Sequence, residues 1–356
     1  MNTSLRLVQV AAVLSFMATA LPSFPQVSGN EPYSVMKSAR VGGEGGYDYV
    51  YADSDGRRLY IPRDNRVTVF DLDTLSPSGE IAKANNVHGV AVDPESHHGF
   101  CSSQPIVMWD TQTLAPIKTI EVQGHPDGIF LDPATRRVFV LSHSAPNVTV
   151  IDARDGSIIG TIDLGGAPEQ GVSDLKGHVY IDIEDKDNVA AVDASSLKVL
   201  AHYGLGGKGG TPAGLAIDPK NRILFACCRS PQAVVILNAD DGSIITSLPI
   251  GRGVDSAEFN AGTMEAFSSQ GDGTLTVVKE VSPSSFEVEQ NVATRAGART
   301  STLDTKTNRI FLITAEWAQP TPVPTVAGAS AGGARSGWSR RGPMIPGSFT
   351  ILVVGR

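Results

Sequence analysis

The sequence predicts an all-β protein, a seven-bladed β-propeller closed by an N-terminal strand that completes the last blade. Three observations support this prediction: a repeated pattern of a turn anchor and an aromatic residue, a recurring third-strand motif, and an unmatched strand at each end of the repeats. Repeats of about 40–50 residues that each supply a few strands are typical of propeller blades. The 356 residues can hold seven such units without a second domain.

The clearest single repeat lies between His125 and Gly166. It predicts four short strands, at residues 129–131, 137–142, 147–152 and 158–164. β-Branched and aromatic residues fill these runs, while Asp-Pro and Asp-Gly pairs separate them. The Asp132-Pro133 pair favours a turn, because the carboxylate can accept backbone N–H groups and proline presets φ. One such unit leaves its apolar faces uncovered and therefore needs neighbours.

The same pattern recurs along the chain. An Asp or Asn anchors the first turn of each copy, and an aromatic residue follows seven positions later, in the pairs Asp53–Tyr60, Asp93–Phe100, Asp132–Phe139, Asp218–Phe225, Asn260–Phe267 and Asp304–Phe311. A shortened copy with Asp174 and Tyr180 fills the remaining gap. Seven copies predict seven blades.

The two ends of the repeat array fit together. Residues Tyr33–Gly43 resemble a fourth strand, whereas the last copy ends with its third strand, Ser348–Val354. We therefore expect the N-terminal strand to complete the last blade, which removes exposed sheet edges. The last copy also carries a Pro/Gly/Ala-rich insertion at 316–347. It is either a lid or partner-binding arm, or an insertion tolerated at a loop tip.

The first 20 residues have the pattern of a secretory signal peptide, with Arg6, an apolar run from Leu7 and small residues before position 21. The run is too short to span a membrane. We expect a signal peptide at 1–20, a linker at 21–32 and one propeller at 33–356, exported to the periplasm or secreted, with no transmembrane span. The net charge of −8 argues against nucleic acid as a partner. A closed ring needs no partner subunit, so we expect a monomer.

Three stretches resemble the pattern Tyr/Phe-Val/Ile followed by Asn-x-Val/Thr-x-Val-x-Asp: YIPRDNRVTVFD at 60–71, FVLSHSAPNVTVID at 139–152 and YIDIEDKDNVAAVD at 180–193. This pattern resembles the YVTN β-propeller repeat of YncE-like exported proteins, over about residues 33–356. The resemblance implies the propeller fold. It implies no common catalytic set, because such proteins include scaffolds, surface proteins and binders as well as enzyme-like relatives.

Polar residues recur five positions before the turn anchors, where the chain enters each first strand and the loops crowd around the channel. These positions hold Asp48, His88, Asp127, Ala213, Asp255 and Arg299, with Glu169 or Gln170 in the short copy. We expect a ligand-binding ring at the channel mouth, made of Asp48, His88, Asp127, Glu169, Gln170, Asp255 and Arg299. Loop residues expected on the same face are Arg63, Asp64, His143, Glu184, Asp185 and Arg229.

The ring has three interpretations. It is a polar, solvated channel mouth in which Arg299 pairs with acidic neighbours; or it binds a small ligand or a divalent cation such as calcium; or it is catalytic. If a metal is bound, its expected ligands are His88, Asp127, Glu169 and Asp255. A metal at this place could polarise a carbonyl, as a lactonase requires.

The favoured function is a non-catalytic binding or scaffold module that takes a protein, peptide or small ligand on the channel face. The alternative is a metal-assisted, lactonase-like hydrolase. The sequence has no Walker-type G-x-x-x-x-G-K-[ST] and no H-E-x-x-H motif. Its cysteines, Cys101, Cys227 and Cys228, form no C-x-x-C-H, which excludes a covalent c-type haem.

Overall fold

The structure, a computed structural model, describes residues 31–319 and 342–356. Residues Tyr33–Arg356 form one compact unit. The expected signal peptide and nearly all of the expected linker lie outside the described residues. Within the described part of the chain, no helix is long and apolar enough to cross a membrane.

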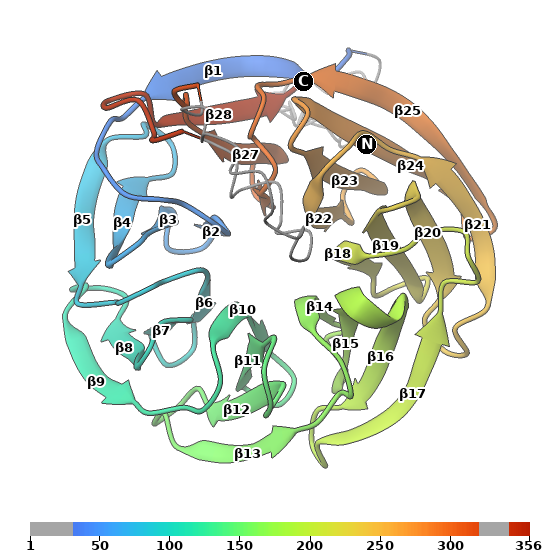
Figure 1. The fold of residues 1–356 in the computed structure, drawn as a ribbon, viewed down its shortest axis with the longest axis horizontal. Coiled ribbons are helices and arrows are strands. Elements are labelled where there is room, and N and C mark those ends of the chain that lie inside the picture. Colours follow the sequence, from blue (N-terminus) through green and yellow to red (C-terminus); the bar gives the residue numbers. More distant parts are fainter. Residues whose placement is uncertain (1–30, 320–341) are drawn as a thin grey trace, which may run out of the picture. The chain divides into compact units, whose positions relative to one another are not determined.

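Seven four-stranded antiparallel sheets stand around a central axis as the blades of a propeller (Figure 1). In the view of Figure 1, the first strand of a blade lies next to the axis and the fourth strand lies at the rim. The prediction of an all-β, seven-bladed propeller is confirmed.

The first four blades follow the chain in order. Blade 1 contains β2 (Tyr51–Asp53), β3 (Arg58–Arg63), β4 (Arg66–Asp71) and β5 (Pro77–Ala82). Blade 2 contains β6 (Val90–Asp93), β7 (His98–Cys101), β8 (Ile106–Asp110) and β9 (Pro116–Ile120). Blade 3 contains β10 (Pro126–Asp132), β11 (Arg137–Ser142), β12 (Val148–Asp152) and β13 (Ile158–Ile162). Blade 4 contains β14 (Pro168–Ser173), β15 (His178–Ile183), the 3₁₀ turn η1 (Glu184–Lys186), β16 (Asn188–Asp193) and β17 (Lys198–Gly204).

The remaining blades complete the ring. Blade 5 contains β18 (Pro212–Asp218), β19 (Ile223–Arg229), β20 (Gln232–Asn238) and β21 (Ile244–Pro249). Blade 6 contains β22 (Val254–Asn260), β23 (Glu265–Gln270), β24 (Thr274–Ser282) and β25 (Ser285–Ala293). Blade 7 contains β26 (Ser301–Asp304), β27 (Arg309–Thr314), β28 (Thr350–Gly355) and, from the other end of the chain, β1 (Ser34–Arg40).

The N-terminal strand closes the ring as predicted. Strand β1 pairs antiparallel with β28, in a register that places Arg40 opposite Thr350. Next to β1, the Tyr33 hydroxyl donates a 2.6 Å hydrogen bond to the buried carboxylate of Glu265 in blade 6. The Arg356 guanidinium lies 3.0 Å from the same carboxylate. Both ends of the propeller unit are therefore joined to one buried acid of the neighbouring blade.

Each of several turn-anchor aspartates has two roles: it accepts hydrogen bonds within its own turn, and it pairs with an arginine of the next blade. In blade 3, Asp132 Oδ2 accepts hydrogen bonds from the backbone N–H and the hydroxyl of Thr135, at 3.0 and 2.5 Å. The chain then passes through a left-handed residue, Arg136, with φ of 55°. Its guanidinium reaches the anchor of the preceding blade, Asp93, at 2.5 Å. The same arrangement joins Arg57 to Asp304 and Arg222 to Asp174. One repeat position thus closes a turn and links neighbouring blades.

The aromatic residue that follows each anchor, by seven positions or by six in blade 4, lies on a second strand and is buried. Phe139, for example, packs between blades 3 and 4 with Val179 and Ile181. Burying such a side chain contributes about 1.5–3 kcal/mol. The equivalent residues Tyr60, Phe100, Tyr180, Phe225, Phe267 and Phe311 are all at most 2% exposed. The core is therefore a series of layers between blades, and the repeat supplies one aromatic residue to each.

Some strand limits differ from the sequence prediction. Strand β11 has the predicted limits, but β10 begins three residues earlier than predicted and β13 ends at Ile162. Leu164 leaves the strand because its N–H donates to the side chain of Asn147 and its side chain is buried. Blade 6 has the two longest of the described strands, β24 and β25.

The described ends of the 316–347 insertion pair with each other. The N–H of Ala318 donates to Pro343 O at 2.9 Å, and the N–H of Ile345 donates to Glu316 O at 2.8 Å. Residues 320–341, which make up most of the insertion, lie outside the described part. The described base of the insertion is thus a short antiparallel ladder that continues blade 7.

Candidate functional site

The predicted ring positions lie where the chain enters the innermost strands, at one end of the central channel. Asp48 and His88 come just before β2 and β6, Asp127 and Glu169 lie at the starts of β10 and β14, and Asp255 lies at the start of β22. Because every first strand borders the axis, these short approaches bring together side chains that are far apart in sequence (Figure 1).

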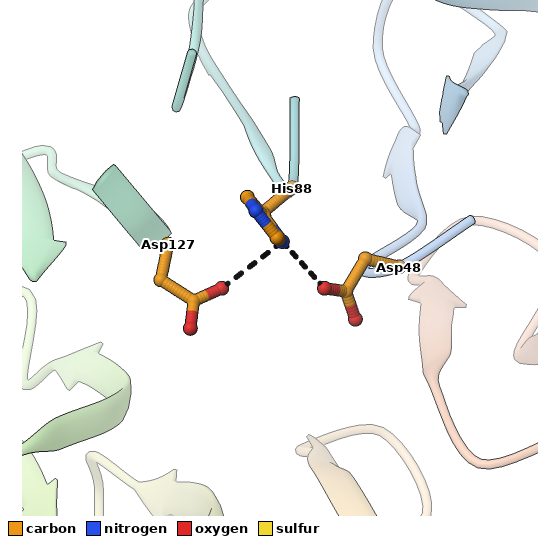
Figure 2. A group of neighbouring side chains, drawn as sticks. All are labelled: Asp48, His88 and Asp127. Atoms are coloured by element: carbon orange, nitrogen blue, oxygen red, sulfur yellow. Dashed lines mark hydrogen bonds and ion pairs between the residues drawn. The ribbon is translucent and has the colours of Figure 1, made fainter. Parts of the chain in front are cut away.

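His88 lies between two carboxylates. Its Nδ1 is 2.8 Å from Oδ2 of Asp48 and 3.4 Å from Oδ1 of Asp127, so one ring nitrogen faces acids from blades 1 and 3 (Figure 2). The Nε2 atom lies 3.1 Å from the side-chain amide of Asn86. These contacts fix the imidazole of His88 across the channel mouth.

A second histidine continues the chain of contacts. His143 follows β11, and its Nε2 lies 3.4 Å from Oδ2 of Asp127 and 2.9 Å from Oε2 of Glu169. Asp127 therefore has one oxygen directed to each of two histidines. The His143 side chain is 44% exposed and that of His88 is 30% exposed. The two imidazoles are the most solvent-accessible members of this cluster.

Two arginines close the cluster into a ring. Arg229, at the end of β19, lies 3.0 Å from Glu169, 2.5 Å from Glu184, and in contact with Asp255. Arg299 lies 2.6 Å from Asp255 and 3.4 Å from Asp48.

The channel mouth thus carries one closed circuit in which acids and bases alternate. Its order is Asp48, His88, Asp127, His143, Glu169, Arg229, Asp255 and Arg299. We call these eight residues the charged ring. All seven blades contribute to it, so the ring can form only when the propeller has closed.

Six of the seven predicted ring residues belong to the charged ring, and Gln170 does not. The side-chain amide oxygen Oε1 of Gln170 accepts hydrogen bonds from the N–H groups of Leu215 and Ala257, at 2.9 and 3.2 Å. Gln170 therefore links the innermost strands of blades 4, 5 and 6.

His143 and Arg229 were expected only as loop residues of the same face. The small side chain of Ala213, at the blade 5 ring position, is matched by Arg229, which extends into the circuit from the end of the second strand. Other loop residues have local roles: Arg63 donates to the carbonyl groups of Gly46 and Glu44, and Asp185 accepts the N–H of Ala167.

Burial and neighbouring charges shift the pKa values of several residues of the charged ring. Burial raises the pKa of Asp127 to about 7, and the charges of Glu169 and Asp48 act in the same direction. The hydrogen bond to Glu169 raises the pKa of His143 to about 9. For His88, burial opposes protonation, but the hydrogen bond to Asp48 and the nearby acidic charges raise its pKa above the usual value. Both imidazoles are therefore favoured in the protonated, donating form.

Tyr49 lies beneath the ring. Its hydroxyl is buried and has no hydrogen-bond partner among the described residues. Burial raises the pKa of Tyr49 well above its ordinary value, and the charges of Glu169, Asp255, Asp127 and Asp48 add to this effect. A buried donor without a partner is uncommon in folded proteins. Tyr49 is thus a buried donor without a described acceptor, close to the acids of the ring.

Two overlapping sets of ring residues have the composition of a metal site. The first is Asp48, His88 and Asp127, and the second is Asp127, His143 and Glu169; within each set the donor atoms lie within 4.8 Å of one another. Imidazole together with carboxylate suits zinc, manganese or iron better than calcium, which prefers oxygen ligands alone. Asp255, which the sequence suggested as a ligand, lies between two arginines and belongs to neither set.

The comparisons with known proteins concern the fold. No protein-family model matches the sequence, and no curated protein matches it. Solved structures do match: one described as RRP9 WD40 repeats has a TM-score of 0.70 at 11% identity, over 91% of this chain and 97% of that one. A chain of a mitotic checkpoint complex has a TM-score of 0.69 at 14% identity, over 85% and 95%.

A chain of Kuenenia stuttgartiensis hydrazine synthase has a TM-score of 0.65 at 16% identity, covering 77% of this chain and 94% of that one. At such low identities the similarity establishes the seven-bladed propeller fold alone, so the function has to be inferred from the residues of the site.

Proposed function

We propose that this protein is an exported propeller of the YVTN, YncE-like type that binds a charged peptide, protein segment or small ligand on the charged ring. The observation that carries the proposal is the closed circuit of four acids and four bases at the channel mouth. The similar solved structures support a binding role, since they include WD40 repeats and a component of a checkpoint complex.

The ring is suited to recognition because its charges are already in place. A ligand carboxylate can approach the two histidines, the most exposed members of the ring, and a ligand cation can approach Asp127 or Glu184. Charges held in position give specificity, since a partner of the wrong sign is repelled. The exposed edge at the two histidines is the side on which a ligand would first make contact.

The test is affinity capture with matched variants. The purified protein is used to capture ligands from the extracellular or periplasmic fraction of its source, and the captured molecule is then titrated against Asp127→Asn and Arg229→Gln. A turn variant at the opposite end of the blades, Asp193→Asn, is the control. We expect the ring variants to weaken binding at least about tenfold, because each removes a charge-assisted contact. Equal affinity for ring and control variants would overturn the proposal.

A second candidate, a metal-assisted lactonase-like hydrolase, is favoured by the two overlapping metal-type sets. Asp127 belongs to both sets, and His88, His143, Asp48 and Glu169 would complete them. A bound divalent metal would supply Lewis-acid polarisation of a substrate carbonyl. The protein's own residues would orient the ligand, with Arg229 held beside Glu169 by its ion pair.

Metal content decides between the two candidates. Elemental analysis of the purified protein is combined with thermal unfolding in EDTA and in Zn²⁺, Mn²⁺ or Ca²⁺. Asp127→Asn removes the ligand that both sets share, whereas Asp255→Asn changes a ring residue outside them. A hydrolase requires a stoichiometric metal that Asp127→Asn loses and Asp255→Asn keeps. Absence of metal and of any ion-dependent shift would exclude the hydrolase and leave the binding module.

A further inference from the structure

A cavity of about 520 Å³ runs along the innermost strands beneath the charged ring. At one end it is lined by Tyr49, Glu169 and Gln170, and at the other by turn residues that include Leu175 and Thr305. Leu175 is 56% exposed, so the second end reaches the protein surface. This volume is within the range of small-molecule sites. The channel therefore has room for a ligand independent of the ring.

One level of the cavity is formed by equivalent residues of all seven blades. The position two residues before each turn anchor is occupied, in blade order, by Tyr51, Ala91, Phe130, Val172, Ala216, Glu258 and Thr302, and every one of them lines the cavity. Six of these side chains are uncharged, and two are aromatic. Glu258 is the single ionisable carboxyl at this level.

Glu258 differs from the other acids of the cavity wall. Asp53 accepts the N–H of Gly56, Asp55 pairs with Lys306, and Glu169 belongs to the charged ring. Among the residues that the structure describes, Glu258 has no hydrogen bond or ion pair. A carboxylate in such a place is costly unless a ligand or water compensates it.

The surroundings of Glu258 are apolar. In the register of blade 6 it lies opposite Phe267, so both side chains share one sheet face, and Phe267 packs with Leu303 of blade 7. Burial is the sole cause that raises the pKa of Glu258 to about 8. The charge of Glu258 also contributes to the raised pKa of Tyr51, after burial and the charges of Asp53 and Tyr60.

We propose that the central channel binds a small organic cation, an aryl-alkyl ammonium, with its charged nitrogen at the Glu258 carboxylate and its apolar part against Tyr51 and Phe130. Glu258 has the one carboxyl at an otherwise uncharged level of the cavity, and its ionised form favours a positively charged ligand. Aromatic rings attract cations through their faces and also bury apolar groups.

A metal ion fits this place less well. Divalent cations need several oxygen or nitrogen ligands, and this level offers one carboxylate with the hydroxyl groups of Tyr51 and Thr302. An anion would find no base at this level, and the ionised form of Glu258 would repel it. An organic ammonium needs one counter-charge and an apolar wall, and both are present.

The test uses 2-phenylethylammonium and its neutral counterpart, 2-phenylethanol, in calorimetric titrations of the purified protein at pH 9, above the pKa of Glu258. We expect the cation to bind about tenfold or more tightly than the alcohol, as a charge-assisted contact requires. Glu258→Gln should abolish this preference while leaving the alcohol affinity nearly unchanged. Glu80→Gln, an exposed acid on the rim strand β5, is the control and should retain the preference.

Three results would overturn the proposal. They are cation binding that survives Glu258→Gln, equal affinity of the cation and the alcohol for the unaltered protein, and no binding of the cation up to about 10 mM. The comparison of the two probes needs no variant and remains decisive even if Glu258→Gln does not fold. Because the probes bind beneath the ring, Asp127→Asn should leave the preference intact, which separates this site from the proposed ring function.

Discussion

The buried carboxyl of Asp182 offers a sharp test of the electrostatics beneath the charged ring. Asp182 lies on β15, is 0% exposed, and its Oδ1 accepts a 2.6 Å hydrogen bond from the N–H of Gln170. Its Oδ2 is buried with no partner among the described residues. Burial raises its pKa from 3.8 to about 8. Asp182→Asn keeps the shape and the acceptor but cannot ionise.

The size and sign of the effect follow from linkage. A carboxyl whose pKa is higher in the folded state gives its full stability below the unfolded pKa, near 4, and loses it as the pH rises towards 8. About four pKa units correspond to roughly 5 kcal/mol. Asp182→Asn avoids this loss. The variant should match the unaltered protein near pH 4 and exceed it by roughly 5 kcal/mol above pH 8.

The assay is guanidinium unfolding of both proteins between pH 4 and pH 9. Asp193→Asn provides a control of opposite sign, because the Ser196 N–H and hydroxyl lower the pKa of Asp193, so this carboxylate stabilises the fold at neutral pH. A stability difference between Asp182→Asn and the unaltered protein that stays constant across the pH range would show that the pKa of Asp182 is not raised in the folded protein. An Asp182→Asn variant that is less stable than the unaltered protein at pH 8 would show the same.

Two further predictions concern the closure and packing of the blades. Tyr33→Phe should lower the free energy of unfolding by about 1–3 kcal/mol, because it removes one hydrogen-bond donor from the buried Glu265. Chemical unfolding measures this difference, and an unchanged midpoint would show that closure of the ring does not depend on the contact. Gly171→Ala should lower the free energy of unfolding by about 1–3 kcal/mol, because the added Cβ would lie 2.2 Å from the Phe130 ring. A variant as stable as the unaltered protein in thermal unfolding would contradict this packing.

The fold was largely predictable because one local pattern specifies each blade. The anchor Asp132 forms its turn from neighbouring residues, and Phe139 is buried by the strand period, so both signals are local. Closure by β1 was predictable from the missing strand at the other end of the repeat array. The end of β13 was not predictable from the sequence. The backbone N–H of Leu164 donates to the side chain of Asn147, which lies between β11 and β12, and no sequence periodicity indicates such a contact.

The candidate site was predictable only in part, for a geometric reason. Residues before first strands, such as His88 and Asp127, have a fixed place around the axis, so a repeat position identifies them. His143 and Arg229 reach the ring from the ends of second strands, and their participation depends on side-chain length and on the small Ala213. A systematic comparison of equivalent repeat positions would have singled out Glu258, the one charged residue at its level.

The most direct test of the ring as a binding site is hydrogen exchange of the protein with and without its captured ligand. We expect slower exchange in the segments that carry His88, His143 and Arg229, and no change in the turns at the other end of the blades, such as that after Asp193. Protection confined to those opposite turns, with unchanged exchange around the ring, would contradict it.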